Sequence, residues 1–201
     1  MDRTVALQAE NIPLLEQVLG SATYKKLNVI ELGSGCGIVG IGLAQTVPDC
    51  EVTLTDLPEA EEIVNHNITA MNPAISSRAT FQALDWEEPL PAKIQDRLFD
   101  MILVADCTYN PDSSPALVKT LSALVKRSPK AIIVVAMKVR HESELIFFDY
   151  MKDASLVIES HVILPLPRNE EWSDASEHVD LYVFRDKGRA YRPETPLVWV
   201  S

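Results

Sequence analysis

Residues 31–42 read ELGSGCGIVGIG, and this stretch holds five of the seven glycines of the chain within ten residues. An apolar run, residues 28–32 (NVIEL), leads into it and a helical apolar pattern follows, as in a turn between a buried strand and a helix. Glycines in such a turn allow positive φ angles and let a ligand reach bare backbone N–H groups. We expect Gly40 and Gly42 to let the helix pack closely on the sheet. The stretch therefore predicts a βα unit whose turn binds a ligand.

Two nucleotide-type cofactors fit this turn. The spacing G-x-G-x-x-G from Gly35 is that of a dinucleotide-binding fingerprint, with Asp56 about 20 residues downstream to bind ribose hydroxyls. The spacing E-x-G-x-G-x-G from Glu31 is that of an S-adenosylmethionine-binding loop, whose acidic residue lies near the cationic amino-acid end of the cofactor. Asp56 serves both cofactors, because both carry a ribose. The loop favours S-adenosylmethionine and leaves the dinucleotide as the alternative.

Short apolar runs alternate with longer helical patterns along the rest of the chain, which predicts βαβ units and a parallel sheet. The predicted strands cover residues 28–32, 51–56, 80–84, 101–105, 131–136, 156–164 and 179–185. The predicted helices cover residues 37–47, 59–71 and 142–152, with another marked by Leu117, Leu121 and Leu124 and an opening helix from Leu7 to Leu19. We expect one domain over residues 1–186, with the opening helix inside residues 1–27, and a separate tail over residues 187–201.

The composition is that of a globular domain, with 201 residues of which 47% are hydrophobic and 23% charged. No apolar run approaches the ~20 residues that cross a bilayer. A net charge of −11 repels phosphate backbones and anionic lipids. Three cysteines without CxxC spacing and four scattered histidines predict reduced thiols and no metal site. We therefore expect a cytoplasmic protein, with a nuclear location also open, that binds neither nucleic acid nor membrane.

Three further segments follow or enclose predicted strands. Leu84-Asp85-Trp86 follows the third strand, residues 99–109 (FDMILVADCTY) end on D-x-x-Y, and residues 137–142 (MKVRHE) follow the fifth strand. In this order they resemble the class I, seven-stranded S-adenosylmethionine-dependent methyltransferases. The similar branch is that of the methyltransferase-like non-histone protein-lysine methyltransferases, which includes fungal nicotinamide N-methyltransferase-like proteins. The resemblance covers residues 29–184 and implies an α/β fold, a Rossmann-like three-layer sandwich with a mostly parallel seven-stranded sheet and an antiparallel last strand.

The resemblance also implies a role for each motif residue. The glycine turn would cradle the amino-acid end of S-adenosylmethionine, the end of the second strand its ribose, and the segment after the third strand its adenine. The implied cofactor-binding residues are Glu31, Gly33, Ser34, Gly35, Gly37, Asp56, Leu57, Asp85, Trp86 and Ala105. The implied catalytic residues are Asp106 and Tyr109, which would face the methyl group.

The implied acceptor is a lysine side chain of a partner protein. With an ordinary pKa near 10.4, about one lysine amine in 2,500 is neutral at pH 7, which is a penalty of about 4.6 kcal/mol. Because a carboxylate favours the protonated amine, we assign Asp106 to capturing and orienting the lysine, and loss of its proton to desolvation and a water path. Tyr109 would place an aromatic wall or a hydroxyl beside the amine. Cys107 has no evident activating base and is expected to be a structural thiol. Arg140 and Glu142 either form an ion pair bracing this side or are the ordinary charged start of a helix.

Other functions stay open at this point. The runner-up is a small-molecule N- or O-methyltransferase, since loops such as residues 167–177 choose the acceptor. A non-catalytic module that binds the cofactor is a third reading. An NAD-dependent oxidoreductase is disfavoured, because no Y-x-x-x-K motif follows the loop. Family members usually carry a β-hairpin and a W-x-x-x-x-x-L segment before the opening helix, and this chain starts too late to hold them. We therefore expect part of the cofactor lid to be missing, and we expect a monomer.

Overall fold

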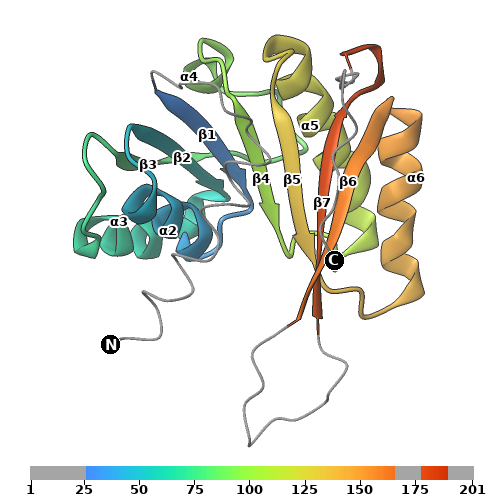
Figure 1. Cartoon of the computed structure of the whole chain (residues 1–201), viewed down its shortest axis with the longest axis horizontal. Helices are drawn as coiled ribbons and strands as arrows, with labels where there is room; N and C mark the ends of the chain where they lie inside the picture. The colour runs from blue at the N-terminus through green and yellow to red at the C-terminus, as the bar shows by residue number, and fades with distance from the viewer. Residues whose placement is uncertain (1–25, 166–177, 190–201) are drawn as a thin grey trace, which may run out of the picture.

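The computed structural model describes residues 26–165 and 178–189, and seven strands in these ranges form one sheet (Figure 1). The strands are β1 (Leu27–Leu32), β2 (Cys50–Asp56), β3 (Arg78–Ala83), β4 (Met101–Ala105), β5 (Ile132–Met137), β6 (Leu156–Pro165) and β7 (His178–Asp186). Each agrees with a predicted strand to within two residues. The predicted opening helix, the loop over residues 167–177 and the tail beyond residue 189 lie outside the described residues.

Five α-helices and four 3₁₀ turns connect these strands in the described ranges. They are α2 (Ile38–Thr46), η1 (Pro58–Ala60), α3 (Glu61–Ala70), α4 (Ala92–Gln95), η2 (Pro111–Ser113), α5 (Ser114–Arg127), η3 (Glu142–Leu145), α6 (Ile146–Asp153) and η4 (Lys187–Arg189). Two predicted helices, over residues 59–71 and 142–152, begin as 3₁₀ turns before α3 and α6. The sequence analysis missed α4, which is too short for a clear apolar period. Over the residues that are described, no helix is long and apolar enough to cross a membrane.

The strand order is β3-β2-β1-β4-β5-β7-β6. The pairs β1–β2, β2–β3, β1–β4 and β4–β5 are parallel, and β7 runs antiparallel to both β5 and β6. The predicted Rossmann-like sheet with an antiparallel last strand is therefore confirmed. The chain winds outward in both directions from the central pair β1–β4. In open α/β sheets this reversal point, at the carboxyl ends of the strands, is where ligands bind.

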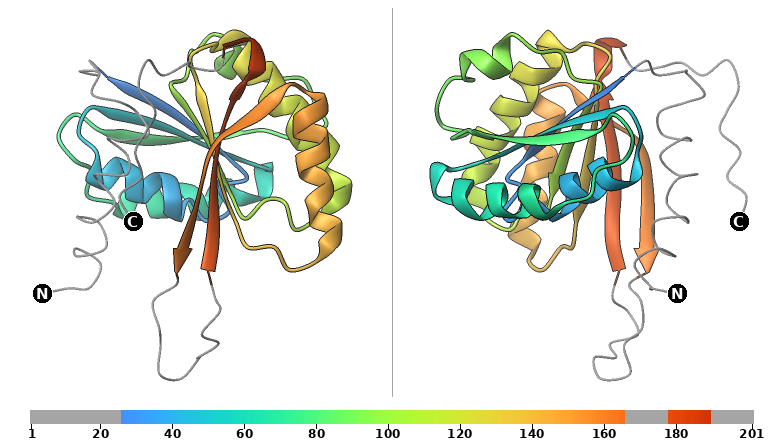
Figure 2. Two further views of the ribbon diagram at one scale, coloured as in Figure 1. Left: turned by 45° about the vertical axis from the view of Figure 1, so that its right-hand side comes forward. Right: turned by 90° about the vertical axis from the view of Figure 1, so that its left-hand side faces the viewer.

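Helices cover both faces of the sheet, as Figure 2 shows. The two apolar layers follow from the alternation of side chains along each buried strand. On one face, α2 and α3 bury Ile41, Ala44 and Val64 against β1 and β2. On the other face, α5 and α6 contribute Leu117, Leu121 and Phe147 to the larger layer. This two-sided burial makes the sheet a rigid frame for the loops at its edges.

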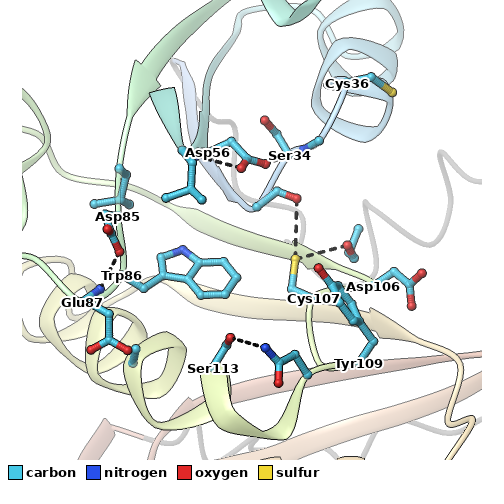
Figure 3. A pocket seen from close by; sticks show the side chains of 17 residues that line it. Ser34, Cys36, Asp56, Asp85, Trp86, Glu87, Asp106, Cys107, Tyr109 and Ser113 are labelled. Atoms are coloured by element: carbon cyan, nitrogen blue, oxygen red, sulfur yellow. Dashed lines mark hydrogen bonds between the residues drawn. The ribbon is translucent and has the colours of Figure 1, made fainter. Parts of the chain in front are cut away.

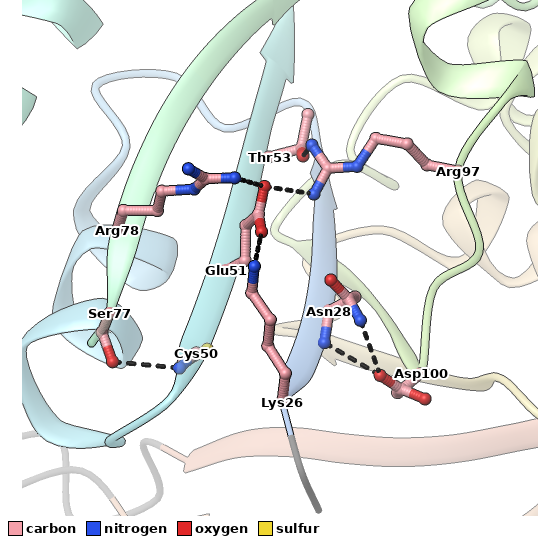
Figure 4. Close-up of polar contacts among 9 residues, drawn as sticks. All are labelled: Lys26, Asn28, Cys50, Glu51, Thr53, Ser77, Arg78, Arg97 and Asp100. Carbon is pink, nitrogen blue, oxygen red and sulfur yellow. Dashed lines mark hydrogen bonds and ion pairs between the residues drawn. The ribbon is translucent and has the colours of Figure 1, made fainter. Parts of the chain in front are cut away.

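At the edge where the parallel strands begin, Glu51 is buried and is paired with three cations (Figure 4). The side chains of Lys26, Arg78 and Arg97 approach its carboxylate to 2.5, 2.5 and 2.8 Å. They come from just before β1, the start of β3 and the segment before β4, so the cluster ties three strand entrances to β2. Although burial opposes ionisation, hydrogen bonds from Lys26 and Arg78 and the charge of Arg97 lower the pKa of Glu51 to about 2.

Candidate functional site

A pocket of about 520 Å³ opens at the opposite edge of the sheet, where β1, β2 and β4 end (Figure 3). It is lined by Gly33, Ser34, Gly35, Cys36, Asp56, Leu57, Leu84, Asp85, Trp86, Glu87, Ala105, Asp106, Cys107, Tyr109, Asn110, Ser113 and Ala116. Ten of the twelve site residues predicted from the sequence line this pocket. The two that do not are Glu31 and Gly37.

The glycine turn forms one wall of the pocket because its backbone takes left-handed angles. Gly33 and Gly35 have φ of 63° and 56°, a region that glycine enters without steric cost. A Cβ on Gly33 would stand 2.6 Å from Cys107 Sγ, so the turn packs directly on the segment after β4. Asp56 holds the turn from the side, since its carboxylate accepts hydrogen bonds from the N–H groups of Gly35 (2.7 Å) and Leu57 (2.8 Å). The predicted ribose-binding residue thus also shapes the loop.

Ser34 lies within the glycine turn, and its hydroxyl makes no hydrogen bond to any described residue. The residue is 7% exposed, and Oγ is buried without a hydrogen-bond partner in the described structure. A buried hydroxyl without a partner costs free energy unless something supplies one. Because Ser34 lines the pocket, a polar group of a bound ligand can satisfy it.

Glu31 stands behind the turn, away from the pocket lining. It is 1% exposed, and Oε2 accepts a hydrogen bond from the Gly40 N–H at 2.9 Å. Burial raises the pKa of Glu31 to about 7; the Gly40 bond opposes this rise and the charge of Asp56 adds to it. Gly37, with φ of 82°, precedes α2 and packs near Leu54. In this structure both residues support the turn from within.

The two glycines of α2 differ, contrary to the sequence-based expectation. A Cβ on Gly40 would come within 2.4 Å of Leu54 Cδ2 and 2.6 Å of Glu31 Oε2, so Gly40 does allow close packing on the sheet. A Cβ on Gly42 would meet nothing within 4 Å. The prediction for Gly42 was wrong, because residues two apart on a helix point about 200° apart and only one of them can face the sheet.

The predicted adenine-binding residues, Asp85 and Trp86, line the same pocket, and Trp86 packs against the glycine turn. Trp86 is half-buried and packs against the larger core layer, and its ring lies 3.1 Å from the Cβ position of Gly33. Thr120 of α5 donates a hydrogen bond to the Trp86 carbonyl. Asp85 is exposed, and its carboxylate accepts from the Glu87 N–H at 3.0 Å. Trp86 therefore offers an aromatic surface, and Asp85 a carboxylate fixed at the rim.

Residues 105–109 form the opposite end of the pocket, after β4. Asp106 has φ of 54°, an uncommon angle for a residue other than glycine. Tyr109 is 65% exposed. Cys107 is buried and donates toward the carbonyl oxygens of Leu32 and Gly33. Burial, followed by the charge of Glu31, raises the pKa of Cys107 to about 12, which is consistent with the expected structural thiol.

Arg140 pairs with Asp106 and not with Glu142. Its Nη1 and Nη2 donate to Asp106 Oδ1 and Oδ2 at 2.7 and 2.9 Å. Glu144 takes the capping position, because its Oε1 accepts from the N–H groups of Arg140 and His141. The ion pair between Arg140 and Glu142, one of the two expectations from the sequence, is therefore replaced by a longer-range pair that joins the segments after β4 and β5.

The sequence analysis missed several residues of the lining. Asn110 and Ser113 belong to the turn before α5, where the Asn110 side chain accepts from the Asp112 N–H and donates to Ser113 Oγ. The segment N-P-D-S-S after D-x-x-Y is a readable helix-start signal that places them beside the pocket. Leu84 lies in the Leu84-Asp85-Trp86 motif but has no predicted role, and Glu87 and Ala116 lie in no motif that marks them.

The charge of the lining is one-sided. Four carboxylates, Asp56, Asp85, Glu87 and Asp106, face the pocket, and none of its lining residues is Lys, Arg or His. Within the described parts of the chain, no group of three or more His, Cys, Asp or Glu side chains is placed to hold a metal ion, and Cys36, Cys50 and Cys107 are free. Since carboxylates attract cations and repel phosphates, the pocket suits a ligand with positive charge.

The sequence is similar to known lysine methyltransferases. A family model described as lysine methyltransferase matches residues 6–154. The chain is 32% identical over 172 residues to EEF1A lysine methyltransferase 3 of Mus musculus, covering 85% of this chain and 66% of that protein. It is 32% identical over 158 residues to protein-lysine N-methyltransferase EFM6 of Saccharomyces cerevisiae, covering 73% and 63%. It is 31% identical over 144 residues to protein N-lysine methyltransferase METTL21A of Mus musculus, covering 71% and 64%. The chain thus spans about two thirds of the length of these relatives.

Solved structures share the fold at lower identity. Magnesium protoporphyrin IX methyltransferase of Synechocystis PCC 6803, solved with bound S-adenosylmethionine, superposes with a TM-score of 0.59 at 16% identity, covering 90% of this chain and 80% of that one. N-methyltransferase NodS of Bradyrhizobium japonicum superposes with a TM-score of 0.57 at 18% identity, covering 89% and 96%. Since the family model covers most of the chain and the mouse EEF1A lysine methyltransferase 3 matches 85% of it, the chain belongs to the lysine methyltransferase family of class I S-adenosylmethionine-dependent methyltransferases.

Proposed function

We propose that this protein transfers a methyl group from S-adenosylmethionine to a lysine side chain of another protein. The observation that carries the proposal is the one-sided charge of the pocket, with four carboxylates and no cationic side chain in its lining. S-adenosylmethionine carries a sulfonium and an ammonium group, whereas NAD carries a pyrophosphate that these carboxylates would repel. The charge of the pocket thus favours S-adenosylmethionine over NAD, the two cofactors between which the glycine spacing does not decide.

The residues present fit this cofactor. The unpartnered Ser34 hydroxyl and the bare turn around Gly35 would receive its amino-acid end, with Glu31 and Gly37 acting from behind the turn. Asp56 and Leu57 would hold the ribose, and Asp85 and Trp86 the adenine; Ala105 would lie beneath the cofactor. When bound, the cofactor supplies an electrophilic methyl: the acceptor nitrogen lone pair forms the C–N bond, the C–S electron pair stays on sulfur, and the product ammonium releases its proton to solvent.

Asp106 and Tyr109 would handle the acceptor, because they lie at the end of the pocket away from the adenine side and are open to solvent. The Asp106 carboxylate can accept an N–H from the incoming amine, and the Tyr109 ring can wall its approach. Holding the nitrogen in line with the methyl is the main task of the protein, since an in-line displacement needs position more than acid or base.

The acceptor class is proposed from charge and from the relatives. A chain with a net charge of −11 is complementary to a basic protein segment. Relatives are named for methylating protein lysines, and one is named for EEF1A, which makes EEF1A the first defined acceptor to try. Because the three cysteines are free thiols, we also propose a cytoplasmic location, the nucleus included.

The test is transfer of tritiated methyl from S-adenosylmethionine to purified EEF1A and to the proteins of a cell lysate, followed by acid hydrolysis and identification of methyllysine. We expect label in methyllysine, and a loss of at least about 100-fold in Asp106→Asn, because a misplaced acceptor loses in-line geometry. Asp112→Asn, an exposed carboxylate in the adjacent turn, is the matched control and should keep full activity. Label confined to small molecules would contradict the proposal in favour of a small-molecule methyltransferase.

A further inference from the structure

We propose that Arg140 is a positioning residue that neutralises Asp106, so that Asp106 orients the acceptor amine without holding it as an ammonium ion. This inference rests on the proposed function and concerns the protonation of its acceptor. The starting point is a conflict in the site itself. A carboxylate favours a protonated amine, and a protonated amine has no lone pair with which to attack a methyl group.

The ion pair between Arg140 and Asp106 has the geometry that this role needs. Nη1 donates to Oδ1 at 2.7 Å and Nη2 to Oδ2 at 2.9 Å, in the bidentate arrangement that fixes a pair in one orientation. The hydrogen bond and the charge of Asp106 raise the pKa of Arg140, which therefore stays charged. The two side chains are 45% and 56% exposed, so an acceptor can still reach the carboxylate.

Arg140 is itself held in place from behind. Glu144 is 1% exposed, and its Oε1 accepts from the backbone N–H of Arg140 at 3.3 Å and of His141 at 3.1 Å. Nη1 of Arg140 also lies 3.4 Å from the carbonyl of Lys138. A side chain anchored at its backbone and at its tip loses little freedom on meeting Asp106. Asp106, whose φ is positive, presents its carboxylate to this anchored partner.

Pairing leaves Asp106 able to bind an amine. A carboxylate has about four lone-pair sites and Arg140 uses two of them, so an amine N–H can be accepted at a third. What pairing removes is the net negative charge that would hold the extra proton. A charge within a few ångströms shifts an amine pKa by about one unit or more, and at pH 7 each unit changes the neutral fraction tenfold.

The other charged groups around Asp106 make this compensation more necessary. On the cofactor side, Asp56, Asp85 and Glu87 line the same pocket and add negative charge. Glu31 lies buried behind the glycine turn, and Tyr109 stands three residues further along the loop.

On the β5 side, the titratable groups near Arg140 are Lys138, His141, Glu142 and the buried Glu144. None of these residues lines the pocket. Among the described residues, Arg140 is the cation in contact with Asp106.

The inference can be tested by calorimetry of the full chain at pH 7 without any acceptor protein. Two probes are titrated: S-adenosylhomocysteine, and sinefungin, in which an amine-bearing carbon replaces the methylated sulfonium. In Arg140→Gln we expect sinefungin to bind about tenfold more tightly relative to S-adenosylhomocysteine than in the wild type, because the uncompensated Asp106 attracts the ammonium. Arg140→Lys keeps the charge and should keep the wild-type ratio within about twofold.

Arg127→Gln is the matched control, since it removes an exposed cation that bonds the Gln95 carbonyl, and neither residue lines the pocket. An unchanged ratio in Arg140→Gln, or an equal change for both probes, would overturn the role of Arg140 and leave the proposed function standing. A wild type that binds neither probe would instead overturn the proposed function, and this inference with it. Where an acceptor is methylated, the kcat/KM profile of Arg140→Gln should also move about one unit to higher pH.

Discussion

Glu51 and Glu31 are buried carboxylates on adjacent strands, yet they ionise in opposite ways. Glu51 stands where β2 begins and meets three cations, which lower its pKa to about 2. Glu31 stands near the end of β1, where a single backbone N–H bonds Oε2, and its pKa rises to about 7. At the edge where the parallel strands begin, three cations balance the charge of Glu51, and the cluster stabilises the fold. At the edge where the parallel strands end, Asp106 is paired with Arg140, but the other lining carboxylates add negative charge that no lining cation balances. This excess charge favours a cationic ligand and destabilises the empty protein.

The largest effect is expected from Glu51→Gln. Removing the charge leaves Lys26, Arg78 and Arg97 without their shared partner, and a pKa lowered from 4.5 to about 2 corresponds to about 3 kcal/mol of stability at pH 7. Because the folded pKa lies below the unfolded one, this stability is present above pH 4.5 and disappears as the pH falls toward 2. Urea unfolding of both proteins between pH 7 and pH 3 measures it. The exposed Glu62→Gln is the control and should change stability by less than about 0.5 kcal/mol.

Glu31→Gln should change stability with the opposite sign. Since burial raises the folded pKa of Glu31 above its ordinary 4.5, its charge costs stability above pH 7, and the cost vanishes as the pH falls below about 4.5. We expect the variant to be more stable than the wild type by about 3 kcal/mol at pH 8 and nearly equal to it at pH 4. The same variant should bind S-adenosylhomocysteine more weakly. If Glu31→Gln were destabilised equally at both pH values, the claim that Glu31 and Glu51 ionise in opposite ways would be contradicted.

The smallest effects distinguish Gly40 and Gly42, the two glycines that flank Ile41 in α2. Gly40→Ala places a methyl between Leu54 and Glu31 and should destabilise by about 1.5 kcal/mol. Gly42→Ala meets open space in the same helix and should stabilise by about 0.5–1 kcal/mol through helix propensity. Thermal unfolding of the two variants checks the pair. Equal signs for both would show that α2 does not approach the sheet as closely as the structure has it.

The sequence predicted the seven strands and most of the pocket lining for a local reason. Motif residues that end or directly follow buried parallel strands, such as Gly33, Asp56 and Asp106, must meet at one edge of the sheet. Side-chain direction is less local. The motif places Glu31 near the cofactor, but the structure turns it inward beneath Gly40, outside the pocket lining.

Contacts between distant segments could not be predicted in the same way. Arg140 pairs with a residue 34 positions earlier, and no local pattern in the sequence distinguishes Asp106 from Glu142 as its partner. The Glu51 cluster draws Lys26, Arg78 and Arg97 from separate strand entrances, and no spacing in the sequence marks them as partners. In both cases the register of the sheet brings the charges together.

Binding of S-adenosylmethionine in the carboxylate-lined pocket is tested most directly by calorimetric titration of the full chain with S-adenosylhomocysteine, with NAD titrated in parallel. We predict saturable binding of S-adenosylhomocysteine and no heat from NAD. Asp56→Ala should bind S-adenosylhomocysteine at least about 30-fold more weakly, whereas Asp96→Ala, which removes an exposed carboxylate outside the lining, should bind it as the wild type does. Binding of NAD in place of S-adenosylhomocysteine, or equal affinity in Asp56→Ala, would contradict the account.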